Sequence, residues 1–142
     1  MKALIAIDLQ ESTALILAAT RRFCGTQVEL CLIHVAEPDP AFVGWDAGPQ
    51  SVRESVAKHF HEEHVSIQNY AQTFRDEGYS CKALLIQGPS AESINGEAKK
   101  IGADLIVLGT HGKGITKQLL VGSVSESVLR NSQCPVLLIP TR

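Results

Sequence analysis

Hydrophobic residues along the chain form five short, nearly continuous runs separated by stretches with helical spacing. The runs predict buried β-strands, at residues 2–8, 28–35, 80–88, 103–109 and 134–140. The segments between them predict helices, over 11–23, 51–78, 90–102 and about 122–131. Strands that alternate with helices are typical of βαβ units, and near-continuous apolar strands are typical of sheets covered on both faces. We therefore expect an α/β, doubly wound sandwich with a mainly parallel sheet.

The predicted helices carry their own start signals and an apolar stripe. Ser12 or Thr13 is expected to cap the first helix, and Ser90 the third. The long helix over 51–78 has an approximate apolar stripe, formed by Val52, Val56, Phe60, Val65, Ile67, Tyr70 and Phe74. Residues 36–50 are rich in Pro and Gly and are expected to form a long surface loop or lid.

Length and charge narrow the class of protein. The chain has 142 residues, which predicts one domain over 1–142 with room for a core of its own. Its formal net charge is −2, which argues against broad electrostatic binding to nucleic acid or to an anionic membrane. No apolar run approaches the roughly 20 residues of a membrane span, and the first residues do not resemble a signal peptide. We expect a cytoplasmic protein without membrane insertion.

Four cysteines are present, and their spacing matches neither a C-x-x-C pair nor a zinc pattern. They lie in or beside apolar runs and are interpreted as reduced core or near-core residues, at Cys24, Cys31, Cys81 and Cys134.

The stretch most suggestive of chemistry is "GTHGKGITKQLLVGSV", residues 109–124. Gly109 ends a predicted strand, and glycine there permits a sharp turn and a close approach by a ligand. Gly112 repeats this freedom, and Gly122 with Ser123 begins a helix whose first amides lack internal partners. Backbone amides in such a loop and at such a helix end form an anion site, typically for phosphate. The alternative is that the glycines make only a tight connection.

The same spacing, Gly109-x-x-Gly112, nine residues, Gly122-Ser123, resembles the nucleotide-binding signature of the ATP-binding universal stress proteins. The likeness covers essentially the whole chain, from "ALIAID" to "LLVGSVSESVLRNSQCPVLLIP". The resemblance implies a five-stranded parallel sheet in the order 3-2-1-4-5. It also implies a homodimer that pairs through the last strand, here residues 136–139, and a regulatory role in stress response.

Site residues follow from the resemblance position by position. Phosphate and ribose contacts are expected from Gly109, Gly112, Gly122 and Ser123, with the backbone amide of Val124. The backbone of Ile7 and residue Val35 are expected to border adenine. Asp8 is expected near the ribose or an accompanying Mg²⁺ or Mn²⁺, and the implied ligands are ATP or AMP. The family commonly has a small pair after this Asp, whereas this chain has Leu9 and Gln10.

Charged and polar side chains near these positions allow more than one interpretation. Asp8 is either a helix-capping acid or a ligand for ribose hydroxyls or metal. Lys113 and Lys117 are equally suited to phosphate and to solvent. His34 is interpreted as a hydrogen-bonded buried residue rather than a base. His111 could favour phosphate charge, but it is interpreted as facing solvent. Histidines in the stretch "HFHEEH" are interpreted as a solvated helix face rather than a metal site, at His59, His61 and His64.

Three functions remain open from the sequence. The first is a dimeric adenine-nucleotide-binding regulator. The second is a slow ATPase using the same site, because Asp8 is the one acid placed for a metal and no convincing base is present. The third is a dimeric interaction module that does not bind nucleotide. No catalytic residue is predicted.

Overall fold

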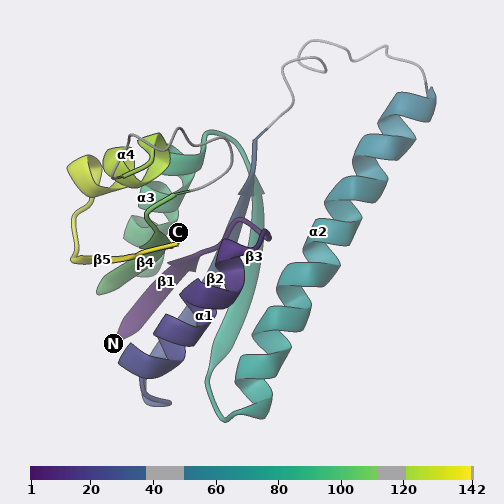
Figure 1. The fold of residues 1–142 in the computed structure, drawn as a ribbon. Helices are drawn as coiled ribbons and strands as arrows, with labels where there is room; N and C mark the ends of the chain where they lie inside the picture. Colours follow the sequence, from purple (N-terminus) through teal and green to yellow (C-terminus); the bar gives the residue numbers. More distant parts are fainter. Residues whose placement is uncertain (38–49, 112–120, 142) are drawn as a thin grey trace.

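A single parallel sheet organises the chain. The computed structural model describes residues 1–37, 50–111 and 121–141, without the side chains of 50–52. The strands are β1 (Lys2–Ala6), β2 (Glu29–Ala36), β3 (Cys81–Gln87), β4 (Leu105–Gly109) and β5 (Val136–Ile139). All neighbouring pairs are parallel, in the order β3-β2-β1-β4-β5 (Figure 1). The order implied by the family resemblance is therefore confirmed.

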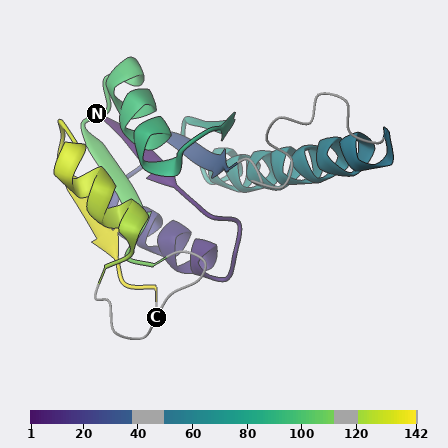
Figure 2. The ribbon, with the colours of Figure 1, turned by 90° about the horizontal axis from the view of Figure 1, so that it is seen from above.

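The helices cover both faces of this sheet, as predicted. They are α1 (Ser12–Phe23), α2 (Gln50–Asp76), α3 (Ser90–Ile101) and α4 (Ser123–Asn131). α1 and α2 pack on one face, and α3 and α4 pack on the other (Figures 1 and 2). Successive residues of β1 alternate between the faces, so that Ile5 joins the α1/α2 core while Leu4 joins the α3/α4 core.

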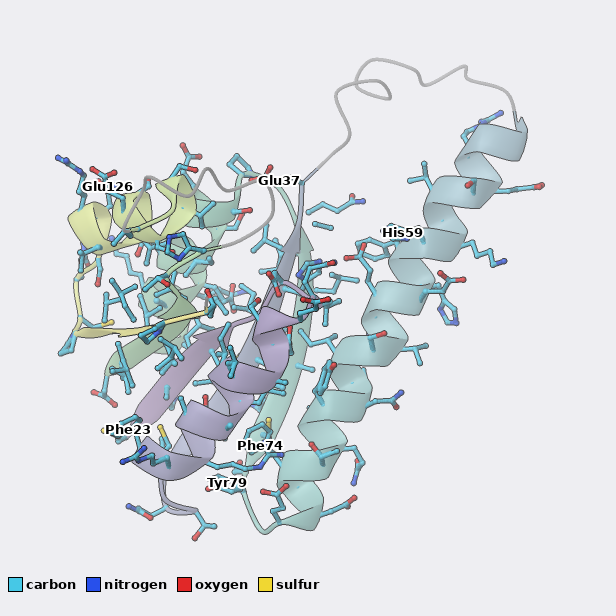
Figure 3. The ribbon with its side chains drawn as sticks, in the orientation of Figure 1. Phe23, Glu37, His59, Phe74, Tyr79 and Glu126 are labelled. Carbon is cyan, nitrogen blue, oxygen red and sulfur yellow. The ribbon has the colours of Figure 1, made fainter. Side chains whose placement is uncertain are left out.

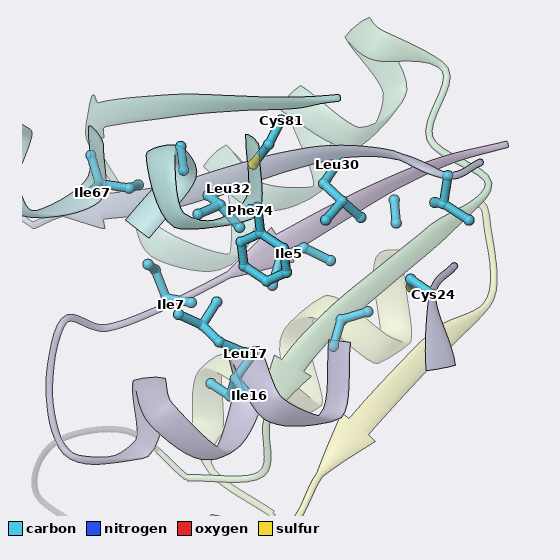
Figure 4. Close-up of a cluster of buried hydrophobic side chains, with 14 of the residues drawn as sticks. Ile5, Ile7, Ile16, Leu17, Cys24, Leu30, Leu32, Ile67, Phe74 and Cys81 are labelled. Carbon is cyan, nitrogen blue, oxygen red and sulfur yellow. The ribbon is translucent and has the colours of Figure 1, made fainter. Parts of the chain in front are cut away.

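Among the described residues, Phe74 of α2 is the largest fully buried side chain, and it anchors the α1/α2 face. Its ring lies among Ile5, Leu30 and Leu32 (Figure 4). The edge of Tyr79 meets this ring with centroids 5.2 Å apart, and the Arg21 guanidinium lies 4.3 Å from the ring centroid. Apolar, aromatic and cationic contacts together fix the carboxyl-terminal half of α2 against the sheet and α1.

Before Ile67, α2 departs from the predicted stripe. Ile67 and Phe74 are buried as expected, but Val56 and Val65 are 40% and 43% exposed. Figures 1 and 2 show that the amino-terminal part of α2 extends away from the sheet, so it has no sheet beneath it. The stripe is therefore a core face only from Ile67 onward.

Two predicted helix caps are also wrong. α1 has Glu11 at its N-cap without a side-chain bond, and Ser12 lies inside the helix. α3 has Pro89 at its N-cap, and Ser90 is its first residue. Ser90 instead donates its amide and its hydroxyl to Glu37 Oε1, at 3.4 and 2.7 Å, so an acid beyond β2 caps this helix (Figure 3).

The cysteines behave as the sequence predicted. Cys24, Cys31 and Cys81 are buried, Cys134 is half-buried, and all four are free thiols. Burial raises the pKa of Cys31 to about 11, and it does the same for Cys81. These two thiols therefore stay protonated and unreactive at neutral pH.

In the described part of the chain, none of the helices combines the length and the apolar character that a bilayer crossing requires.

Candidate functional site

The predicted site lies where the sheet changes its winding direction. From β1 the chain moves through α1 to β2 on one side, and from β3 it returns through α3 to β4 on the other. β1 and β4 are neighbours, with Ile5 paired to Val107, so their carboxyl ends lie side by side. Open α/β sheets bind ligands at such a switch point.

Asp8 organises the loop that leaves β1. Its Oδ1 accepts from the Gln10 amide at 2.9 Å, from Ser12 Oγ at 2.7 Å and from Thr13 Oγ1 at 3.2 Å. The carboxylate thus fixes the start of α1 at the end of β1. It resembles a helix cap, but it bonds to side chains of the first turn and to the amide of the preceding loop. Oδ2 has no partner among the described residues, so one carboxylate oxygen is left for a ligand.

Leu9 shows how this chain accommodates its departure from the usual small pair. Its φ is +59°, in the left-handed region that favours glycine. Its side chain is half-buried and packs against the α1/α2 core. Packing therefore holds a leucine in a turn that a glycine would adopt without strain.

The loop that leaves β4 is closed mainly by backbone groups. The Gly122 amide donates to the Thr110 carbonyl at 2.6 Å, and the Thr110 amide donates to the Ile139 carbonyl at 2.9 Å. Ser125, which is buried in α4, donates its hydroxyl to the Gly109 carbonyl at 2.6 Å. The residues at both ends of the glycine-rich segment are therefore joined to each other and to β5.

Gly109 is required by close packing. A Cβ at this position would lie 2.7 Å from Thr141 Cγ2 and 3.3 Å from Ile16 Cδ1, while the φ of Gly109 is not in the left-handed region. The glycine thus makes room for Thr141 and α1, a structural role that the sequence analysis set beside the ligand role. Both roles are compatible, because the packing fixes the point where the loop begins.

His111 is buried, contrary to the prediction that it faces solvent. It is 8% exposed, and its Nδ1 lies 2.8 Å from Thr110 Oγ1. Its amide donates to Thr141 Oγ1, and Thr141 donates to the His111 carbonyl, both at 3.2 Å. The first residues of the loop are therefore fixed to the segment after β5.

The amino terminus of α4 presents unpaired donors beside this loop. Gly122 is the N-cap and has no side chain to accept a bond, and the first intrahelical bond runs from the Glu126 amide to the Gly122 carbonyl at 2.9 Å. The amides of Ser123, Val124 and Ser125 have no acceptor among the described residues. Ser123 and Val124 are also exposed. Such a row of amides at the positive end of a helix dipole suits an anion.

Ile7 and Val35 lie along the same edge of the sheet. Ile7 follows β1, and its amide donates to the Ile33 carbonyl at 2.9 Å. Val35 is half-buried near the end of β2, on the α3/α4 face. His34, between Ile33 and Val35, is 9% exposed and has partners at both ring nitrogens, which bears out its interpretation as a hydrogen-bonded buried residue.

Some predicted residues cannot be placed. Gly112, Lys113 and Lys117 lie outside the described residues. The structure places the remaining site residues at one edge of the sheet, in or just after β1, β2 and β4 and at the start of α4.

The histidines of α2 do not gather a metal site. His59, His61 and His64 are exposed, as predicted. Across residues 1–37, 50–111 and 121–141, no group of three His, Cys, Asp or Glu side chains is arranged to hold a metal ion.

A groove of about 360 Å³ lies elsewhere, between α3 and α4. It is lined by residues around Asn95 and Gly96 of α3 and around Cys134, which precedes β5. It therefore lies toward the amino ends of β4 and β5, away from the switch point, and does not belong to the predicted site.

Comparison with known proteins agrees with this geometry. The family model for the universal stress protein family matches residues 1–140. The chain belongs to the universal stress protein family.

Individual members of this family match over different lengths. The universal stress protein YxiE of Bacillus subtilis is 29% identical over 144 aligned residues, which cover 97% of each chain. MJ0577 of Methanocaldococcus jannaschii is 36% identical over 73 residues, which cover 51% of this chain and 45% of that protein. The solved structure of MJ0577 superposes with a TM-score of 0.86, at 28% identity, over 99% of this chain and 96% of that chain.

Several contributors to this universal stress protein's site were missed by sequence reasoning. Ser125, Thr141 and Thr110 support the loop, and Glu63 contacts His34. Ser125 lies in the first turn of α4 and Thr141 two residues after β5, and these places are visible in the sequence. The sequence did not show that Ser125 bonds to the Gly109 carbonyl or that Thr141 bonds to the His111 amide and carbonyl.

Proposed function

We propose that this universal stress protein binds an adenine nucleotide, ATP or AMP, at the carboxyl ends of β1 and β4 and acts as a regulator in stress response. The observation that carries the proposal is the set of three α4 amides, at Ser123, Val124 and Ser125, that have no acceptor in the described part of the chain. Such donors suit an anion, and a nucleotide phosphate is the anion that the family resemblance implies.

Two solved relatives support the ligand class. A universal stress protein in complex with cAMP superposes with a TM-score of 0.71 at 17% identity. A universal stress protein from Archaeoglobus fulgidus in complex with dAMP superposes with a TM-score of 0.65 at 17% identity. At these identities the likeness establishes the shared fold, and the transfer of the ligand class to this chain is our proposal.

The proposed contacts divide between two sides of the pocket. Phosphates would meet the amides of α4 and the loop that begins at Gly109, including Gly112 and Lys113. Ribose hydroxyls, or a Mg²⁺ or Mn²⁺ ion carried by the phosphates, would meet the free Oδ2 of Asp8. Adenine would lie against the backbone of Ile7 and near Val35.

We also propose that residues 1–142 act as one cytoplasmic domain that forms a homodimer through β5. β5 is an edge strand, its residues are apolar, and Val136, Leu137 and Leu138 are only half-buried. An apolar edge strand calls for cover by another strand. Sedimentation of the purified protein is expected to show a dimer, and a monomer at high micromolar concentration would contradict this part of the proposal.

The test of nucleotide binding uses a carboxylate to compete for the α4 amides. Gly122→Asp places an N-cap acceptor on those amides, which stabilises the helix by about 0.3–1 kcal/mol but puts a negative carboxylate at the phosphate position. We expect calorimetric titration to show AMP or ATP binding by the wild type and little or none by Gly122→Asp. Opposite changes in stability and affinity are the signature of the proposed site.

Gly122→Ala is the matched control, because it adds a Cβ without an acceptor and should retain most of the affinity. Protein purified without added ligand is also denatured, and its supernatant is analysed by mass spectrometry. Absence of co-purified nucleotide together with no measurable affinity for ATP or AMP would reject the proposal and favour a pure interaction module.

A further inference from the structure

His34 links the end of β1 to helix α2. Its Nδ1 lies 2.9 Å from the carbonyl oxygen of Ile7, and its Nε2 contacts Glu63 Oε2. The side chains of His34 and Glu63 are only 11% and 18% exposed. Ile7 is the residue whose backbone is proposed to border adenine, so this contact joins α2 to the proposed site through one imidazole ring.

The two partners of His34 determine how many protons the contact holds. A carbonyl oxygen can only accept, so Nδ1 must carry a proton and donate it to Ile7. Nε2 then faces a carboxylate oxygen, which also accepts unless it is protonated. A neutral imidazole beside an ionised Glu63 would place two lone pairs against each other in a largely buried position. One further proton must therefore lie between Nε2 and Glu63.

We propose that His34 and Glu63 hold this proton between them and that the protonated pair positions the end of β1 against α2. Loss of the proton breaks the contact, so the attachment of α2 and the position of the Ile7 carbonyl depend on pH. The consequence for adenine-nucleotide affinity rests on the proposed function, whereas the proton and the attachment do not. His34 and Glu63 are positioning residues, because neither is assigned a contact with the nucleotide.

Few other charged groups face this pair in the described residues. On α2, His59 Nε2 approaches the other carboxylate oxygen, Glu63 Oε1, at 3.3 Å, but the His59 side chain is 74% exposed (Figure 3). On the β1 side, the Oδ1 of Asp8 is engaged by Gln10, Ser12 and Thr13. On β3, the residue in register with His34 is the uncharged Leu85. Whether the pair holds its proton therefore depends mainly on His34 and Glu63 themselves.

Glu63→Gln tests the role of the shared proton separately from that of the hydrogen bond between α2 and His34. A glutamine amide can donate to a neutral Nε2, so the variant keeps the bond from α2 to His34 without an additional proton. Glu63→Ala removes the bond altogether. Glu62→Gln is the matched control, since Glu62 is exposed and its ion-pair partner is Lys58 at 4.0 Å. His59→Asn tests the second histidine on the same carboxylate.

The direct readout is the NMR spectrum of the His34 ring nitrogens and the Glu63 carboxyl carbon, recorded from pH about 5.5 to about 8.5, where imidazoles ordinarily titrate. At the lower pH we expect a proton at Nδ1 and a second proton shared with Glu63. In Glu63→Gln we expect the neutral ring with its proton at Nδ1. A bare Nδ1, or a neutral ring beside an ionised Glu63 throughout this range in the wild type, would overturn the inference.

The second readout is the protection of α2 and Ile7 amides from hydrogen exchange, corrected for the intrinsic effect of pH. Protection around Glu63 should fall about fivefold or more in the wild type as pH rises, and Glu62→Gln and His59→Asn should behave like the wild type. Glu63→Gln should show no such fall, and Glu63→Ala should be poorly protected at every pH. Identical pH profiles in the wild type and Glu63→Gln would contradict the inference.

Nucleotide affinity supplies the third readout. AMP carries a phosphate that itself titrates near pH 6, so the quantity to compare is the ratio of wild-type to Glu63→Gln affinity at each pH. We expect this ratio to fall about fivefold between the two ends of the range. A constant ratio would refute the coupling and leave the nucleotide site intact. No binding of AMP or of ATP at any pH would refute the proposed function and the coupling, while the ring spectrum would still decide the proton.

Discussion

The segments that leave β1 and β4 begin side by side, yet their described residues are held in different ways. The β1 loop is gathered around one carboxylate oxygen, Asp8 Oδ1, which takes three donors. The ends of the β4 loop are joined through carbonyl oxygens, which receive the Gly122 amide and the Ser125 hydroxyl. The first arrangement places donors around a negative charge. The second leaves the amides at the start of α4 without an acceptor from any residue that the structure describes. This difference gives one edge of the sheet an acidic side and an anion-attracting side.

The largest effect is expected at Gly109. Gly109→Ala forces a Cβ to within 2.7 Å of Thr141 Cγ2, and overpacking of this kind costs about 2 kcal/mol of unfolding free energy. Gly96→Ala in α3 is the matched control, because nothing lies within 4 Å of its Cβ position and alanine favours a helix by about 0.5–1 kcal/mol. The urea unfolding midpoint should therefore fall for Gly109→Ala and rise for Gly96→Ala. Equal midpoints for the two variants would contradict the packing role of Gly109.

Asp8 is expected to show the next largest effect. Asp8→Ala removes the acceptor for three donors and should lower the unfolding free energy by about 1.5 kcal/mol. Asp8→Asn keeps an oxygen in place and should lose less than half of that. Thermal unfolding separates the two variants, and nucleotide titration then tests whether the charge itself matters to the ligand. If asparagine is as harmful to stability as alanine, the charge rather than the acceptor geometry holds the β1 loop.

Ser125→Ala examines the other loop. It removes the 2.6 Å hydrogen bond to the Gly109 carbonyl in a buried position and should cost about 1 kcal/mol. Ser127→Ala, two residues later on the same helix, serves as a control at a half-buried position. Denaturant unfolding of both variants gives the comparison, and an unchanged midpoint for Ser125→Ala would mean that the loop does not depend on this bond.

The smallest net effect is expected at Leu9. Leu9→Gly relieves a left-handed backbone conformation but loses half-buried packing, so its stability should lie within about 0.5 kcal/mol of the wild type. Leu9→Ala loses the packing without relief of the strain. Glycine should therefore be more stable than alanine here by about 1 kcal/mol, the reverse of the order expected in regular structure. The usual order at this position would show that the turn relaxes when leucine is removed.

The sequence predicted the fold well because the decisive information is local. Each strand is an apolar run bounded by polar residues, and each helix has its own periodicity, so the elements and their order along the chain could be inferred directly. The glycine pattern likewise placed Gly109 and Gly122 at the end of β4 and the start of α4, where the structure has them. The order of strands across the sheet came from the family resemblance rather than from the pattern.

What the sequence could not supply are contacts between distant elements. His111 was expected to face solvent, but it is buried, and its amide and carbonyl are bonded to Thr141 from the segment after β5. Ser90 resembled a cap, but Glu37 accepts from it across the end of β2. The α2 stripe was overestimated because helical spacing does not reveal where the sheet beneath a helix ends. Each of these outcomes depends on which elements become neighbours in space.

The position of Thr141 links the outer strand β5 to the start of the glycine-rich segment. Thr141 lies two residues past β5, and it both packs where a Gly109 side chain would be and bonds to the amide and carbonyl of His111. A shift of the outer strand by a fraction of an ångström is therefore transmitted to the point where the glycine-rich segment begins. A molecule that pairs with β5 can in this way shift the residues that lead to the amides of α4, and an anion bound at those amides can in turn shift β5.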